Sequence, residues 1–76
     1  MRMKRIANNV ALQTIGYVIG GMTNVNIYIR ESGYAKERIF RGLYKDFDRE
    51  KMYKYENCKV TELQADENVL YIGIER

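Results

Sequence analysis

The chain contains no histidine, no proline and no tryptophan, and its 76 residues include a single cysteine, Cys58. Without histidine the protein lacks the commonest general base and the commonest metal ligand. One thiol cannot form an intrachain disulfide, and without a histidine partner it is not a typical catalytic nucleophile. We therefore interpret Cys58 as a buried, unreactive side chain. We expect no enzymatic activity, no cofactor and no metal site.

Long hydrophobic runs are missing as well. No stretch approaches the roughly 18 consecutive apolar residues of a membrane-spanning helix, so we expect no membrane association. The basic start is not followed by an apolar run of signal-peptide quality, because polar residues such as Asn8 and Asn9 interrupt it. The absence of proline also leaves no linker-like segment. We predict a single domain over residues 1–76 in the cytoplasm, where a lone cysteine stays reduced.

The net charge of +3 comes from the beginning of the chain. Arg2, Lys4 and Arg5 supply it, and the remaining chain carries ten basic and ten acidic side chains. Proteins that bind nucleic acids usually spread lysine and arginine over one face. The composition therefore predicts at most weak nucleic-acid binding.

The run from Val69 to Ile74 predicts the central strand of a sheet. Leu70, Ile72 and Ile74 alternate with Val69 and Tyr71, so both faces of this strand are apolar.

We expect residues 58–65 to form the first strand of a hairpin with the run from Val69 to Ile74. Val60 and Leu63 cannot share one face of a regular strand, so we expect a bulge there. The polar connection 66–68 predicts a type I turn plus bulge, with Asn68 in the left-handed conformation.

An N-terminal helix is predicted over residues 10–19, where apolar residues recur at helical spacing. Asn9 is a candidate N-cap, and the glycines at 20–21 are typical of a helix end. Gly16 lies inside this helix, and we attribute it to close approach of the helix to a sheet. For residues 1–9 the sequence does not decide between a tail, a short edge strand and an extra helical turn.

Residues 25–30 alternate between apolar and polar and predict a second central strand. Residues 37–44 return as its partner, and their charges suit an edge strand. A short helix over 49–55 follows, with Asp46 or Asp48 as its cap and with Phe47 and Met52 anchoring it to the core.

The order helix, hairpin, short helix, hairpin predicts an α+β fold. We expect a four-stranded antiparallel sheet made of two hairpins, with the N-terminal helix on one face and the short helix between the hairpins.

Tyrosine is abundant, with seven copies in the chain. Tyr28 and Tyr71 lie on the two predicted central strands, opposite Ile27 and Ile72, on the face away from the N-terminal helix. Tyrosine is enriched at interfaces, so we predict a protein interface there. Its candidate residues are Tyr28, Arg30, Phe40, Tyr44, Val69 and Tyr71. The alternative is that the short helix around Met52 covers these rings.

Three segments together resemble a loose group of small phage and prophage proteins of Gram-positive bacteria. They are Leu12-Gln13-Thr14-Ile15 continuing to Ile29, Arg41-Gly42-Leu43, and Val60 to Ile72. Most proteins of this group are uncharacterised. The resemblance implies a phage accessory protein in the cytoplasm of a bacterial host, acting as a host regulator or as an inhibitor of host defence.

Three functions remain open from the sequence. The first is a protein-interaction module that binds itself or a host protein through the aromatic sheet face. The second is nucleic-acid binding by the basic start together with Tyr28, Arg30 and Tyr71. The third is sequestration of a small anionic ligand between subunits by Arg30, Arg38 and Arg41.

Overall fold

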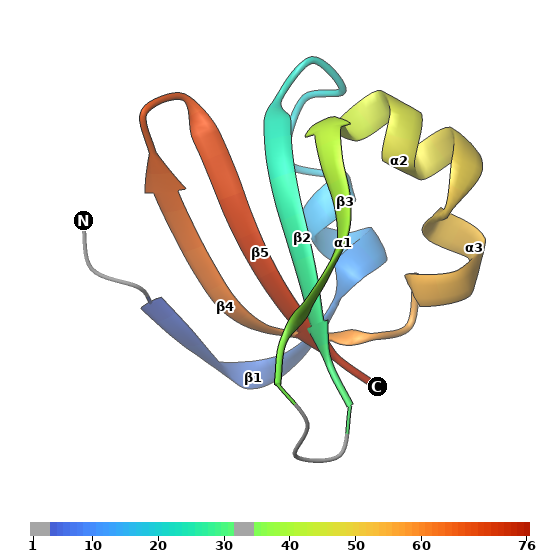
Figure 1. The fold of residues 1–76 in the computed structure, drawn as a ribbon. Coiled ribbons are helices and arrows are strands. Elements are labelled where there is room, and N and C mark those ends of the chain that lie inside the picture. Colours follow the sequence, from blue (N-terminus) through green and yellow to red (C-terminus); the bar gives the residue numbers. More distant parts are fainter. Residues whose placement is uncertain (1–3, 32–34) are drawn as a thin grey trace.

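The computed structural model describes residues 4–31 and 35–76, in which five strands form one sheet and three short helices lie on one side of it (Figure 1). The strands are β1 (Lys4–Ala11), β2 (Asn24–Arg30), β3 (Glu37–Leu43), β4 (Lys59–Asp66) and β5 (Val69–Glu75). The helices are α1 (Leu12–Gly16), α2 (Tyr44–Glu50) and α3 (Met52–Tyr55). The predicted α+β class is confirmed.

The order of the strands is β1-β4-β5-β2-β3, with β2 and β5 parallel and all other neighbours antiparallel. Both hairpins form, and their apolar strands β2 and β5 are adjacent in the interior of the sheet. The prediction of four antiparallel strands is wrong, because β1 adds a fifth strand and the two hairpins meet in parallel. Between them the chain crosses over through α2 and α3, which is the kind of connection that parallel strands need.

The β4–β5 hairpin contains the predicted bulge, seen as a register shift between Val60 and Glu62. Its turn differs from the prediction of a type I turn plus bulge. Asp66 pairs with Val69, and the two intervening residues, Glu67 and Asn68, have φ angles of 47° and 68°. Two consecutive left-handed residues define a type I′ turn, which matches the twist of the flanking strands.

The N-terminal helix is shorter than predicted. Strand pairing with β4 continues to Ala11, which is the N-cap, so Asn9 lies in β1 and does not cap the helix. The helix ends at Gly16, before the predicted glycine stop. Gly16 allows a close approach as expected, but to the Tyr44 hydroxyl of α2 and not to a sheet.

The second helical segment begins earlier than predicted, because α2 follows β3 directly. Leu43 is its N-cap and makes no side-chain capping bond, so the prediction that Asp46 or Asp48 caps the helix is wrong. Phe47 and Met52 are buried in the core, as predicted.

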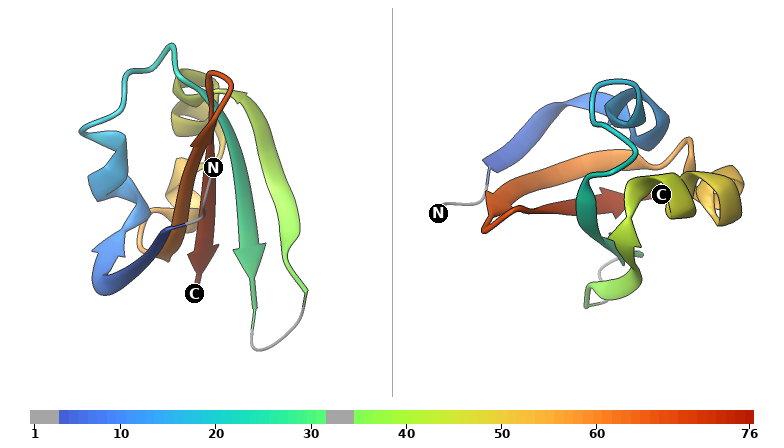
Figure 2. Two further views of the ribbon diagram at one scale, coloured as in Figure 1. Left: turned by 90° about the vertical axis from the view of Figure 1, so that its left-hand side faces the viewer. Right: turned by 90° about the horizontal axis from the view of Figure 1, so that it is seen from above.

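The core lies between the sheet and all three helices (Figure 2). Its buried residues include Leu12 from α1, Phe47 from α2 and Met52 from α3, packed on Ile27 and Ile72 of the two central strands. The helices therefore share one face of the sheet. The alternative in which the segment around Met52 covers the opposite face is wrong.

Candidate interaction face

The side of the sheet opposite the helices carries the candidate site, and we call it the open face. Side chains alternate along a strand, and Val25, Ile27 and Ile29 point into the core, so their neighbours on β2 point to the open face. Cross-strand pairs share a face, which extends the assignment to the other strands. The open face comprises Asn24, Asn26, Tyr28 and Arg30 on β2; Arg38, Arg41 and Leu43 on β3; Lys59, Glu62, Gln64 and Asp66 on β4; and Val69, Tyr71, Gly73 and Glu75 on β5.

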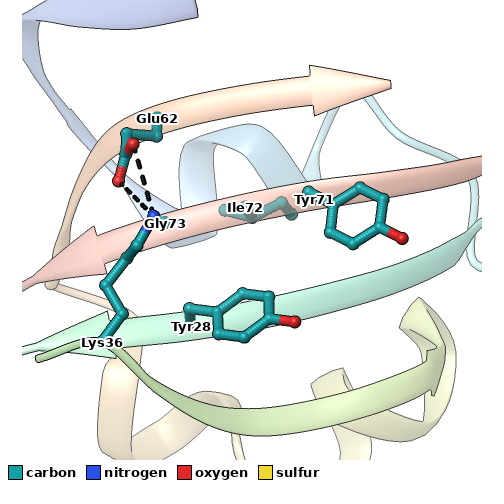
Figure 3. A pocket seen from close by; sticks show the side chains of 6 residues that line it. All are labelled: Tyr28, Lys36, Glu62, Tyr71, Ile72 and Gly73. Carbon is teal, nitrogen blue, oxygen red and sulfur yellow. Dashed lines mark hydrogen bonds and ion pairs between the residues drawn. The ribbon is translucent and has the colours of Figure 1, made fainter. Parts of the chain in front are cut away.

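Tyr28 and Tyr71 stand side by side at the middle of the open face and are half-buried (Figure 3). Beside them is a hollow of about 410 Å³. It is lined by Tyr28, Lys36, Glu62, Tyr71, Ile72 and Gly73. Gly73 has no side chain to fill it, and the Lys36 ammonium crosses above to donate a hydrogen bond to Glu62 Oε1 at 3.2 Å.

A second hollow, of about 400 Å³, opens around Asn26 and Arg41. Asn26 is only 8% exposed, and among the described residues its Oδ1 finds no hydrogen-bond donor. Leaving a buried acceptor unsatisfied costs roughly 1–3 kcal/mol. Asn26 therefore places an unsatisfied acceptor beside this hollow.

On β2 to β5, the charged residues of the open face are grouped by sign. Arg30, Arg38 and Arg41 lie on β2 and β3, whereas Glu62, Asp66 and Glu75 lie on β4 and β5, with Lys59 as the exception. We call these two sides the basic flank and the acidic flank. The face therefore carries a basic and an acidic half side by side, which favours a partner with the reverse arrangement.

Four of the six predicted interface residues lie on the open face: Tyr28, Arg30, Val69 and Tyr71. The placement of Phe40 and Tyr44 there is wrong. The Phe40 ring lies 5.3 Å from that of Phe47 on the core side, and Tyr44 is 4% exposed at the start of α2.

Asn26, Gly73 and Glu62 belong to the site but were not among the predicted interface residues. Period-two alternation from Tyr28 and Tyr71 places the first two on the same face, so the signal was present. Glu62 depends on the bulge after Val60, and Lys36 reaches the hollow from outside the regular strands; neither follows from local pattern.

The described residues hold no group of three or more histidine, cysteine, aspartate or glutamate side chains suited to a metal ion. Cys58 is buried, and burial raises the pKa of its thiol, an effect that nearby Arg76 only partly offsets. A thiol held protonated is a poor nucleophile. Within residues 4–31 and 35–76, no helix is long and apolar enough to cross a membrane.

Known proteins offer no relative from which a function can be transferred. The resemblance to small phage proteins therefore stays a prediction, and the open face is the feature that bears on function. No protein-family model, curated protein or solved structure matches this chain.

Proposed function

We propose that this protein is a non-enzymatic interaction module that associates with a second copy of itself through the open face. The observation that carries the proposal is the pair of half-buried rings, Tyr28 and Tyr71, on two central strands that no described helix covers. Aromatic rings in the middle of a polar face, with arginines beside them, are the composition typical of protein interfaces. Tyrosine offers a large contact area at a low cost in side-chain entropy.

A second copy supplies what a chain of this size lacks. A domain of 76 residues buries only about 60% of the surface that its unfolded chain exposes, and pairing adds core without adding chain. Four strands about 4.8 Å apart and four rows about 6.8 Å apart give a face of roughly 500 Å² per copy. The total of about 1,000 Å² is at the low end for specific interfaces, so we expect a weak dimer with micromolar affinity.

The biological role that fits this proposal comes from the resemblance noted above. It is that of a phage accessory protein that regulates a host process or inhibits host defence. In this role the dimer is the form that binds, and the host protein is a second partner.

The test compares wild type with Tyr71→Glu by sedimentation velocity over a range of concentrations. A charge buried between two copies without a partner is strongly unfavourable, so Tyr71→Glu should be monomeric where wild type is dimeric. Tyr17→Glu is the matched control, because Tyr17 is 82% exposed on the helical side and its substitution should leave the dimer intact. A monomeric wild type at all concentrations would refute the proposal.

Nucleic-acid binding is the second candidate, since Arg38 and Arg41 flank the tyrosine rings on the open face. Stacked bases on aromatic rings beside arginine are the usual mode of single-strand recognition. The acidic flank on the same face opposes a polyanion, which is why we rank this function second.

A further inference from the structure

The parallel pairing of β2 with β5 aligns four pairs of residues on the open face. The pairs are Asn24 with Val69, Asn26 with Tyr71, Tyr28 with Gly73, and Arg30 with Glu75. In three of these rows the two residues complement each other. Asn26 offers a hydrogen-bond acceptor and Tyr71 a hydroxyl donor. Tyr28 has a large ring whereas Gly73 has no side chain, and Arg30 is a cation whereas Glu75 is an anion.

We propose that two copies pair face to face about a two-fold axis parallel to β2 and β5 and midway between them. This inference rests on the proposed self-association and specifies its geometry. Such an axis lays β2 of one copy over β5 of the other at the same level. Each row then meets the same row reversed, as an isologous interface requires. The contact has the aligned geometry of two packed sheets.

In the row of Tyr28, the ring of one copy enters the hollow above Gly73 of the other. Packed sheets lie about 10 Å apart, so a tyrosine on one needs a small residue opposite it on the other. Gly73 is the smallest possible partner and borders a hollow of about 410 Å³, although the Glu62 side chain lies over Gly73, with its Oε1 3.0 Å from where a Cβ would stand. The Lys36–Glu62 ion pair must swing aside, at small cost, because both side chains are partly exposed.

In the row of Asn26, the Tyr71 hydroxyl of one copy reaches the Asn26 Oδ1 of the other. This acceptor has no donor among the described residues and is covered within one chain, so the side chains around it must shift for the hydroxyl to reach it. The pairing is reciprocal, so one dimer satisfies both acceptors. It also sets a long side chain opposite a short one, as in the neighbouring row.

The charges select this axis over the other in-plane choice. With the axis parallel to the strands, the basic flank lies over the partner's acidic flank, Arg30 opposite Glu75 and Arg38 opposite Glu62. With the axis perpendicular to the strands, β3 would lie over β3 of the other copy, so arginines would face arginines. Like charges brought together in an interface are strongly unfavourable.

The test exchanges the charges of one row. Arg30 and Glu75 are cross-strand neighbours within one chain but form no ion pair among the described residues, so each reversal costs the fold only one side-by-side contact of like charges. R30E alone and E75R alone each bring two like-charged pairs into the dimer, and each should raise the dimer dissociation constant by roughly tenfold or more. An equimolar mixture of the two variants restores both pairs and should form a heterodimer with near wild-type affinity.

The readout is sedimentation of fluorescently labelled R30E with unlabelled E75R, beside each variant alone. Recovery of the dimer only in the mixture supports the proposed axis. If wild type dimerises but the mixture stays monomeric, or if the single variants dimerise as wild type does, the axis is wrong while self-association stands. If wild type is monomeric, both proposals fall. The doubly substituted chain R30E/E75R should dimerise alone, and it replaces any single variant that does not fold.

Discussion

Ile39 illustrates how one residue decides what the open face carries. It is the extra residue of an irregularity in β3, between Phe40, which pairs with Ile27, and Arg38, which pairs with Tyr28. Because of this insertion, Arg38 and Arg41 point to the same face, three positions apart, while Phe40 points to the core. Regular alternation would separate the two arginines. The basic flank therefore depends on a bulge that a pattern of charges alone does not reveal.

Tyr44 provides a prediction at the residue scale. Burial, assisted by the charge of Asp48, raises its pKa from 10.0 to about 12. A raised pKa in the folded state means that stability from the neutral phenol is fully present below pH 10 and is lost as the pH rises to about 12. The free energy of unfolding should fall through this interval.

The check is a series of urea titrations from neutral pH to pH 12, in wild type and in Tyr44→Phe. Phenylalanine does not ionise, so the fall in stability at alkaline pH should be smaller in the variant. All other side chains are the same in the two proteins, so their contributions cancel in the comparison. Equal alkaline losses in the two proteins would mean that Tyr44 ionises as freely in the folded state as in the unfolded chain.

At the scale of elements, β5 is the middle strand of the sheet, and its residues Ile72 and Ile74 lie in the core beneath the helices. Ile72 is fully buried, between Ile27 on β2 and Leu63 on β4. Its side chain contacts both hairpins at once. Loss of these contacts therefore weakens the junction on which the whole sheet depends.

We expect Ile72→Ala to lower the free energy of unfolding by about 2–5 kcal/mol, which is a large share of the stability of a domain this small. Urea unfolding should be measured in the monomeric Tyr71→Glu background, so that dimerisation does not contribute. Val18→Ala is the control: Val18 is 77% exposed, and the change should stay within about 0.5 kcal/mol. A small loss for Ile72→Ala would contradict the central role of β5.

For the whole molecule, the charge distribution limits the affinity for nucleic acids. The net charge of +3 lies in Arg2, Lys4 and Arg5, and the rest of the chain is neutral. The basic flank of the open face attracts a polyanion, whereas the acidic flank repels it. Binding to a polyanion should therefore be weak and driven by few ionic contacts.

We predict that affinity for a short single-stranded oligonucleotide, measured by fluorescence anisotropy, is weak and collapses with added salt. Replacing Arg2, Lys4 and Arg5 by glutamine should abolish it while leaving the dimer unchanged, which separates this activity from self-association. Submicromolar binding by the substituted protein that survives about 200 mM salt would make nucleic-acid binding the first candidate.

Local pattern determined much of this protein. The apolar alternation in 25–30 and 69–74 identified two of the three inner strands, and the spacing of Val60 and Leu63 identified a bulge. Such features depend on neighbours within a few residues, so they can be read from the sequence. The same alternation indicated that Tyr28 and Tyr71 share a face, and four of the six candidate site residues followed from it.

Only the tertiary structure decided how these pieces meet. Residues 4–11 have no clear alternation and form a strand because β4 offers them a free edge. The same apolar strands could pair in either direction, and the crossover through α2 and α3 makes β2 and β5 parallel. Both helices lie on the core side because Phe47 and Met52 bury against the face that already holds Leu12. These choices depend on contacts between residues far apart in the chain, where a local pattern carries no information about the partner.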